Sequence, residues 1–209
     1  MGAAKTWEDH YTRRARKEKW LARSVYKLQE IDRKYRLLFP GARILDLGCH
    51  PGSWTQYCLQ KTGGGGEVIG IDLQRPDGLS APNFRFLEED VLQLEPEALR
   101  DSLGPMDVVL SDLAPRTTGV KSSDASRSAE LASAASNIAA SVLKPGGHFL
   151  GKIFESQDVK GLRQDLRRRF AEVKAIRPDA VRKGSRELYL LGLKLRGDRP
   201  SGRRSSESL

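Results

Sequence analysis

The chain has 209 residues, of which 38% are hydrophobic, and a formal net charge of +9. A chain of this length fits one compact domain with a sizeable buried core. It contains no apolar run of the ~20 residues that a membrane span needs, and its first residues lack the apolar segment of a secretory signal. These features exclude a membrane-embedded or secreted class, and we expect a cytoplasmic protein that does not contact membranes.

Cysteine and histidine are too few and too scattered for a metal centre. The two cysteines are Cys49 and Cys58, and the three histidines are His10, His50 and His148. Neither set has the spacing of a zinc site or of a disulfide framework. We therefore expect no metal, no disulfide and a reducing compartment.

Basic residues exceed acidic ones, 36 against 27. The isoelectric point near 9.7 meets the rough threshold for a nucleic-acid partner, although composition alone leaves open a merely soluble basic protein. The segment from Lys5 to Arg36 is the most basic, and its apolar residues recur at spacings that fit one helix face. These residues are Trp20, Leu21, Val25, Leu28 and Ile31.

The remainder of the chain alternates between strand and helix patterns. We predict strands over residues 42–47, 67–72, 84–87, 107–111, 148–154, 172–177 and 186–195, and helices over about 53–61, 123–143 and 159–170. This alternation indicates an α/β, Rossmann-like fold whose mostly parallel sheet has helices on both faces. The loop between the last two strands is too short for a helical crossover, so we expect one antiparallel strand. We assign residues 1–12 to a flexible extension, 13–196 to one domain and 197–209 to a disordered basic tail.

A glycine-containing loop, residues 48–54, follows the first predicted strand. Gly48 and Gly52 let a ligand approach the backbone closely. The loop contains a proline and is not G-x-G-x-x-G, so it suits a cofactor without phosphates, such as S-adenosylmethionine, better than a dinucleotide. Asp72, at the end of the second strand, is placed to accept hydrogen bonds from ribose hydroxyls, and Asp90, after the third, to face an adenine amino group.

Four further polar residues stand out by their positions. Lys27 lies on the helix before the first strand, Asp112 follows the fourth strand, Lys152 lies within the apolar fifth strand, and Glu187 opens the last strand. A lysine in an apolar strand is expensive to bury without a partner, so Lys152 is the most informative of the four.

The motifs Asp-Leu-Gly…Pro-Gly-x-Trp, Ser-Asp-Leu-Ala-Pro and Ser-Arg-Glu-Leu-Tyr, with the apolar-Lys-apolar strand, closely resemble the FtsJ/RrmJ family of RNA ribose 2′-O-methyltransferases. The resemblance covers roughly residues 13–195. It implies the seven-stranded methyltransferase fold, S-adenosylmethionine as cofactor and a catalytic tetrad of Lys27, Asp112, Lys152 and Glu187. It also implies cofactor contacts at Gly52, Trp54, Asp72, Asp90 and Asp112. The chain departs from the family pattern at Cys49-His50, where relatives more often carry two small residues.

The tetrad suits methylation of a ribose 2′-hydroxyl, a weak acid that needs help to attack a sulfonium methyl group. Lys152 can act as base or as hydrogen-bonding orienter with Lys27 as the neighbouring cation, and the two carboxylates can orient the ammonium groups. The resemblance to bacterial members implies a uridine of 23S rRNA within the 50S subunit as substrate, and we expect a monomer. Five basic residues are expected to line the RNA approach: Arg116, Lys121, Arg182, Lys183 and Arg186.

Three alternatives remain open from the sequence. The same chemistry can act on tRNA. The fold can also belong to a non-catalytic RNA-binding factor in ribosome assembly, although the intact tetrad speaks against this reading. A nicotinamide-dependent oxidoreductase is the third, but the loop lacks the glycine spacing of that class.

Overall fold

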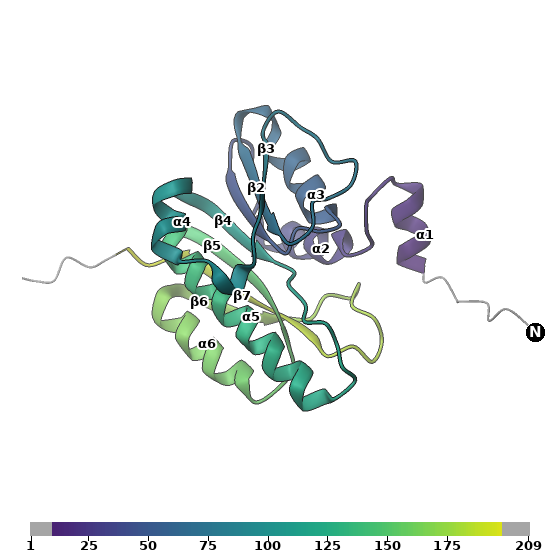
Figure 1. The fold of residues 1–209 in the computed structure, drawn as a ribbon, viewed down its shortest axis with the longest axis vertical. Coiled ribbons are helices and arrows are strands. Elements are labelled where there is room, and N and C mark those ends of the chain that lie inside the picture. Colours follow the sequence, from purple (N-terminus) through teal and green to yellow (C-terminus); the bar gives the residue numbers. More distant parts are fainter. Residues whose placement is uncertain (1–9, 198–209) are drawn as a thin grey trace, which may run out of the picture.

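The computed structural model describes residues 10–197, which form a seven-stranded sheet covered by helices on both faces (Figure 1). The strands are β1 (Arg43–Leu47), β2 (Glu67–Asp72), β3 (Phe84–Glu88), β4 (Met106–Ser111), β5 (Leu143–Phe154), β6 (Phe170–Ile176) and β7 (Glu187–Leu195). The helices are α1 (His10–Lys17), α2 (Val25–Tyr35), α3 (Ser53–Thr62), α4 (Pro96–Leu103), α5 (Lys121–Val142) and α6 (Asp158–Arg169), with short 3-10 turns η1 (Gly63–Gly65) and η2 (Val91–Gln93).

The strand order is β3-β2-β1-β4-β5-β7-β6. Neighbouring strands from β3 to β5 pair in parallel, and β7 is antiparallel to both β5 and β6. The predicted α/β sheet with one reversed strand is therefore confirmed. The β6–β7 hairpin arises because the connection of residues 177–186 is too short to cross the sheet with a helix.

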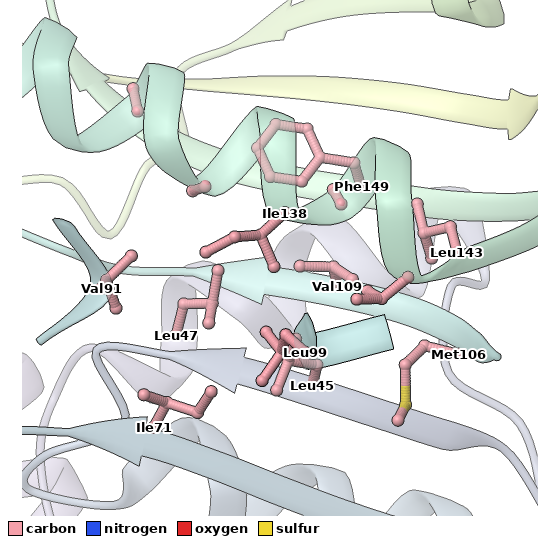
Figure 2. Packing of buried hydrophobic residues seen from close by; sticks show 14 of the residues in the cluster. Leu45, Leu47, Ile71, Val91, Leu99, Met106, Val109, Ile138, Leu143 and Phe149 are labelled. Carbon is pink, nitrogen blue, oxygen red and sulfur yellow. The ribbon is translucent and has the colours of Figure 1, made fainter. Parts of the chain in front are cut away.

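One core lies between the sheet and helices α4, α5 and α6. Figure 2 shows Leu45 and Leu47 of β1 and Val109 of β4 packing towards Ile138 of α5, with Phe149 of β5 beside them. These side chains are at most 1% exposed. Each such burial contributes about 1.5–3 kcal/mol, so this core fixes the positions of the central strands that carry the site.

A second core covers the opposite face, where α1, α2 and α3 pack. Helix α2 is held there by the buried carboxylate of Asp32. Its Oδ1 accepts a hydrogen bond from the amide of Leu38 at 2.9 Å, and its Oδ2 accepts one from the hydroxyl of Tyr57 on α3 at 2.9 Å. Lys61, also on α3, lies 3.7 Å from the same Oδ2. Asp32 thus fixes the helix that carries Lys27 to the rest of the domain.

The N-terminal segment is not the single helix that its apolar spacing predicted. Lys19 has a φ of 61°, a left-handed conformation that interrupts the helix, and Trp20 and Leu21 lie in the connection between α1 and α2. Helix α1 begins at His10, so residues 10–12 of the expected extension are helical. The rest of that extension, and the expected tail from residue 198 on, lie outside the described residues.

Helix α4 and the start of strand β5 also differ from prediction. Helix α4 was not predicted, because an eight-residue helix has too few turns for a clear apolar period. Strand β5 begins at Leu143, before Pro145-Gly146-Gly147, because Leu143 pairs with Met106 across a register shift in β4. The proline and glycines therefore lie within an irregular strand rather than before it.

We expect Asp32→Ala to lower the free energy of unfolding by about 2–4 kcal/mol, because it leaves a buried amide and a buried phenol without their acceptor. Denaturant unfolding followed by circular dichroism measures this loss. Lys34→Ala, an exposed change on the same helix, is the control and should stay within about 0.5 kcal/mol of the wild type. Equal stability of Asp32→Ala and the control would show that Asp32 does not anchor α2.

Candidate active site

The predicted site residues converge at one edge of the sheet. Asp72 ends β2, Asp112 follows β4, and Lys152 lies two residues before the end of β5. Glu187 opens β7, and because β7 runs antiparallel, its first residue lies at the edge where the parallel strands end. The reversed strand thus adds a side chain that a parallel strand would place at the far edge.

The register of β5 and β7 sets which side chains meet. Lys152 lies opposite Tyr189, and Glu187 lies opposite Phe154. Since side chains alternate between faces, Tyr189 and Glu187 share the face of Lys152. On the other side of β5, Gly151 pairs with Ser111, which places the following residue, Asp112, beside Lys152.

The structure brings all four tetrad side chains together. Lys152 Nζ is 3.0 Å from Asp112 Oδ1 and donates to the Asp112 carbonyl at 2.6 Å. Lys27 Nζ donates to Glu187 Oε1 at 2.5 Å. The same Oε1 lies 4.0 Å from Lys152 Nζ, so Glu187 lies between the two ammonium groups. Lys27 and Lys152 are only 8% and 6% exposed, which makes these partners necessary.

Tyr189 is a site residue that the sequence analysis missed. Its buried hydroxyl donates to Asp112 Oδ1 at 2.7 Å, and its ring lies 5.9 Å from Lys27 Nζ. Burial opposes ionisation of Asp112, but the charges of Lys152 and Lys27 and the hydrogen bond from Tyr189 outweigh it and hold the pKa of Asp112 below its usual value. The Ser-Arg-Glu-Leu-Tyr motif contains Tyr189, but only the β5–β7 register shows its contact.

An acidic cavity of about 290 Å³ opens beyond the ends of β1, β2, β3 and β4. Four carboxylates line it: Asp72, Glu89, Asp90 and Asp112. Its apolar walls include Leu73, Leu113 and Leu131, and none of its lining residues within the described chain is lysine or arginine. This lining attracts cations and hydrogen-bond donors and repels a pyrophosphate.

The glycine loop forms one wall of the acidic cavity. Gly48 has a φ of +76°, and a Cβ there would lie 2.8 Å from a side-chain carbon of Leu113, so only glycine fits. The Asp72 carboxylate accepts a hydrogen bond from the His50 amide at 2.9 Å, which fixes the loop to β2. Asp90 accepts one from the Leu92 amide at 3.0 Å and thereby caps η2.

Two predicted cofactor residues do not line the acidic cavity. A Cβ at Gly52, whose φ is +112°, would meet Leu21 and Pro76 at 2.8 Å each, so Gly52 allows the close packing of those segments. Trp54 is buried, and its Nε1 donates to the Ser24 carbonyl at 2.9 Å. Trp54 therefore joins the start of α3 to the residue that precedes α2.

A basic cavity of about 200 Å³ is lined by two tetrad residues, Lys27 and Glu187, together with Arg23, Ser24 and Arg182. A small connecting cavity of about 10 Å³ shares Ser24 with the basic cavity and shares Gly48, His50 and Asp112 with the acidic one. The connecting cavity has room for about one water molecule. Two cavities of opposite charge are thus lined by tetrad residues.

Asp46 lies buried in β1 behind the glycine loop. Its Oδ2 accepts a hydrogen bond from Thr55 Oγ1 at 2.7 Å, and its Oδ1 has no hydrogen-bond partner. Burial raises the pKa of Asp46 from 3.8 to about 7; the bond from Thr55 opposes this rise, and the charges of Asp112 and Asp72 add to it. In the sequence, only its place in the Asp-Leu-Gly motif marks Asp46.

The raised pKa of Asp46 predicts a stability that falls as the pH rises. In the unfolded chain the carboxyl ionises near pH 3.8, whereas in the folded chain it stays protonated up to about pH 7. Wild type should therefore lose roughly 2–4 kcal/mol relative to Asp46→Asn between pH 4 and pH 7, with no further change above. Denaturant unfolding at several pH values measures this difference, and Asp101→Asn, on the exposed surface of α4, controls for the lost charge. A pH-independent difference for Asp46→Asn would contradict the assignment.

Comparison with known proteins agrees with this geometry. The family model described as FtsJ-like methyltransferase matches residues 20–195. A protein of Desulfosudis oleivorans named ribosomal RNA large subunit methyltransferase E is 46% identical over 184 residues, which cover 88% of this chain and 89% of that protein. A protein of Sorangium cellulosum with the same name is 46% identical over 186 residues, covering 89% and 87% of the two chains.

The fold comparison gives the same result. A crystal structure from Plasmodium falciparum described as a ribosomal RNA methyltransferase superposes with a TM-score of 0.73 at 28% identity, covering 85% of this chain and all of that one. The family model spans all four tetrad residues, from Lys27 to Glu187. The chain belongs to the FtsJ-like methyltransferase family.

Proposed function

We propose that the protein transfers a methyl group from S-adenosylmethionine to a ribose 2′-hydroxyl of 23S rRNA in the large ribosomal subunit, at a uridine. The relatives bear the name ribosomal RNA large subunit methyltransferase E, which supports this substrate. The observation that carries the proposal is the meeting of an acidic and a basic cavity at the tetrad. Such a substrate places the proposed activity in the cytoplasm. No helix among residues 10–197 is long and apolar enough to cross a membrane.

Methyltransferases of this family use S-adenosylmethionine, and the acidic cavity fits it. The cofactor supplies a methyl group on a positively charged sulfur, and its ribose, adenine amino group and ammonium group all donate hydrogen bonds. Asp72 and Asp90 would accept from such donors at the ends of β2 and β3, as the acidic residue of dinucleotide folds does. Leu73, Leu113 and Leu131 offer apolar walls for a nucleobase.

The tetrad is arranged to position the 2′-hydroxyl. Two acceptors of Asp112, Oδ1 and the carbonyl, hold Lys152 Nζ, which leaves its remaining N–H to donate to a ribose oxygen. Glu187 lines the basic cavity and is placed to accept the hydrogen bond of the 2′-hydroxyl, while Lys27 holds the Glu187 carboxylate in place. Fixing the oxygen in line with the connecting cavity supplies much of the rate, since orientation alone can contribute several kcal/mol.

Exposed basic side chains surround this edge. Arg116, Arg182 and Lys183 are exposed in loops that flank the site, and Lys121 is exposed at the start of α5. Arg186 Nη2 donates to the Lys121 carbonyl at 3.0 Å and so ties the start of β7 to the start of α5. Contacts of these exposed lysines and arginines to RNA phosphates would give affinity and salt dependence rather than sequence specificity.

Transfer of label from S-adenosylmethionine tests the proposed function directly. We expect label on unmodified large subunits, recovered as a 2′-O-methylated dinucleotide after alkaline hydrolysis, with less on naked 23S rRNA and none on tRNA. Label on tRNA alone would contradict the proposed rRNA substrate and support the proposed 2′-O-methylation. Absence of label from all three RNAs, with cofactor binding intact, would favour a non-catalytic assembly factor.

We expect Lys152→Ala to lower kcat by roughly 10²–10⁴-fold, because the 2′-oxygen loses its hydrogen-bond donor. Binding of S-adenosylmethionine, measured by calorimetry, should persist because Lys152 does not line the acidic cavity. Lys160→Ala on α6 removes an exposed lysine that lines neither the acidic nor the basic cavity, and it should retain full activity. An unchanged kcat in Lys152→Ala would remove Lys152 from the mechanism.

We expect Asp72→Ala to weaken S-adenosylmethionine binding roughly 10–100-fold, because both the cofactor and the His50 amide lose an acceptor. Calorimetric titration measures the dissociation constant. Asp77→Ala removes an exposed carboxylate from the following loop and should bind as the wild type does. Equal affinities of the two variants would place the cofactor ribose elsewhere.

A further inference from the structure

His50 is a residue of the acidic cavity whose side chain the proposed mechanism does not use. It lies in the loop between β1 and α3, two residues after Gly48. His50 lines both the acidic cavity and the connecting cavity, as Gly48 and Asp112 do. These three residues therefore mark the end of the acidic cavity that adjoins the tetrad, of which Asp112 is a member.

The backbone and the imidazole of His50 have separate surroundings. The backbone amide donates to Asp72 Oδ2 at 2.9 Å, and this bond fixes the loop to β2. The imidazole makes no hydrogen bond or ion pair with any residue from 10 to 197, and His50 is exposed. The side chain is therefore available to a ligand, and its removal leaves the bond that holds the loop.

The other ionisable groups of the acidic cavity are carboxylates. Asp72 ends β2, Glu89 and Asp90 follow β3, and Asp112 follows β4. Within residues 10–197 the lining contains no lysine or arginine, so His50 is the one lining side chain that can carry a positive charge. A ligand carboxylate is therefore repelled by this lining everywhere except at His50.

The carboxylate of S-adenosylmethionine needs a partner at the end of the acidic cavity that adjoins the tetrad. In this cofactor the amino-acid chain and the reactive methyl group are bonded to the same sulfur. Transfer to a hydroxyl held by the tetrad requires the methyl group, and the amino-acid chain with it, at this end. The acceptors proposed for ribose and adenine, Asp72 and Asp90, lie at the ends of β2 and β3. The amino-acid chain would therefore meet Gly48, His50 and Asp112.

The start of α3 adds a second attraction for an anion at the same end. Ser53 and Trp54, the first two residues of this ten-residue helix, line the connecting cavity together with His50. A helix N-terminus carries a partial positive charge, equivalent to roughly half an elementary charge, and stabilises a nearby anion. A carboxylate beside His50 would thus lie close to an imidazole and to the positive end of a helix.

We propose that His50 binds the carboxylate of S-adenosylmethionine and so selects a methyl donor with an intact amino-acid end. This inference rests on the proposed function, because it requires the cofactor to occupy the acidic cavity with its sulfur towards the tetrad. The family pattern more often has a small residue at position 50, so the contact would be a feature of this chain in particular.

His50 could instead only neutralise the acidic lining. An imidazolium in that role would weaken the attraction for every cationic ligand, whether or not the ligand has a carboxylate. Removal of the side chain would then strengthen the binding of S-adenosylmethionine. Pairing with the carboxylate has the opposite effect, so the two roles differ in the sign of the change.

Calorimetric titration of the full chain with two ligands separates these roles. Decarboxylated S-adenosylmethionine keeps the sulfonium and ammonium groups and lacks only the carboxylate. We expect His50→Ala to weaken the binding of S-adenosylmethionine roughly 5–20-fold, as loss of a charged hydrogen bond at an exposed site does. Affinity for the decarboxylated ligand should stay within about twofold of the wild type or increase, because the variant loses no contact to that ligand.

The pH dependence of binding gives a readout that a merely structural role would not move. An imidazole changes its charge between about pH 5 and pH 8, and an anion bound to it favours the protonated form. The advantage of the wild type over His50→Ala for S-adenosylmethionine should therefore fall as the pH rises from about 6 to about 8. His50→Gln offers a neutral donor, so its affinity should be intermediate and its advantage over His50→Ala should not change with pH.

His10→Ala is the matched control, since it removes an exposed histidine of α1 that lines neither the acidic nor the connecting cavity. It should bind both ligands as the wild type does. Unchanged or stronger binding of S-adenosylmethionine by His50→Ala, or an equal loss for both ligands, would overturn the inference. A wild type that shows the expected dependence on His50 but transfers no methyl group to RNA would contradict the proposed function alone.

Discussion

Two lysine ammonium groups lie almost out of water at the centre of the site, and the pairing of their charges constrains the elements around them. A buried ammonium costs several kcal/mol unless carboxylates and hydrogen bonds compensate it. Lys152 is paired with the Oδ1 and the carbonyl oxygen of Asp112, and Lys27 is paired with the carboxylate of Glu187. The two lysines and their two partners come from α2, β5, β7 and the loop after β4. All four elements must therefore keep their relative positions for the site to form.

The reversal of β7 is what makes this pairing possible. A seventh parallel strand would end at this edge instead of beginning there, and the motif that opens β7 would lie at the opposite edge. Because β7 is antiparallel, both Glu187 and Tyr189 reach the tetrad from one strand, two residues apart on one face. Tyr189 helps to hold Asp112 in place, since its hydroxyl and Lys152 Nζ both contact Asp112 Oδ1. The architecture of the sheet and the chemistry of the site therefore depend on the same strand.

The sequence predicted those features that depend on local pattern or on whole motifs. Strand β2 and its final Asp72 were predicted to the residue, because a buried parallel strand is a continuous apolar run with a polar end. The tetrad was predicted through motif resemblance, and the structure brings its members together. Contacts between distant segments were not predictable: Tyr189 needs the β5–β7 register, and the raised pKa of Asp46 needs its burial. The break in the helix at Lys19 was not predictable, because the apolar spacing continues across it although the helical backbone does not.

The opposite charges of the two cavities also bear on how the products leave. The acidic cavity attracts a methyl donor that carries positive charge on sulfur, and this charge disappears when the methyl group is lost. In the proposed reaction, Glu187 of the basic cavity accepts the hydrogen bond of the ribose hydroxyl, and methylation removes that hydrogen. In the proposed reaction, each side of the site therefore recognises the feature that the reaction removes. Because the loss of a recognised charge or donor weakens binding on both sides, this arrangement favours release of both products.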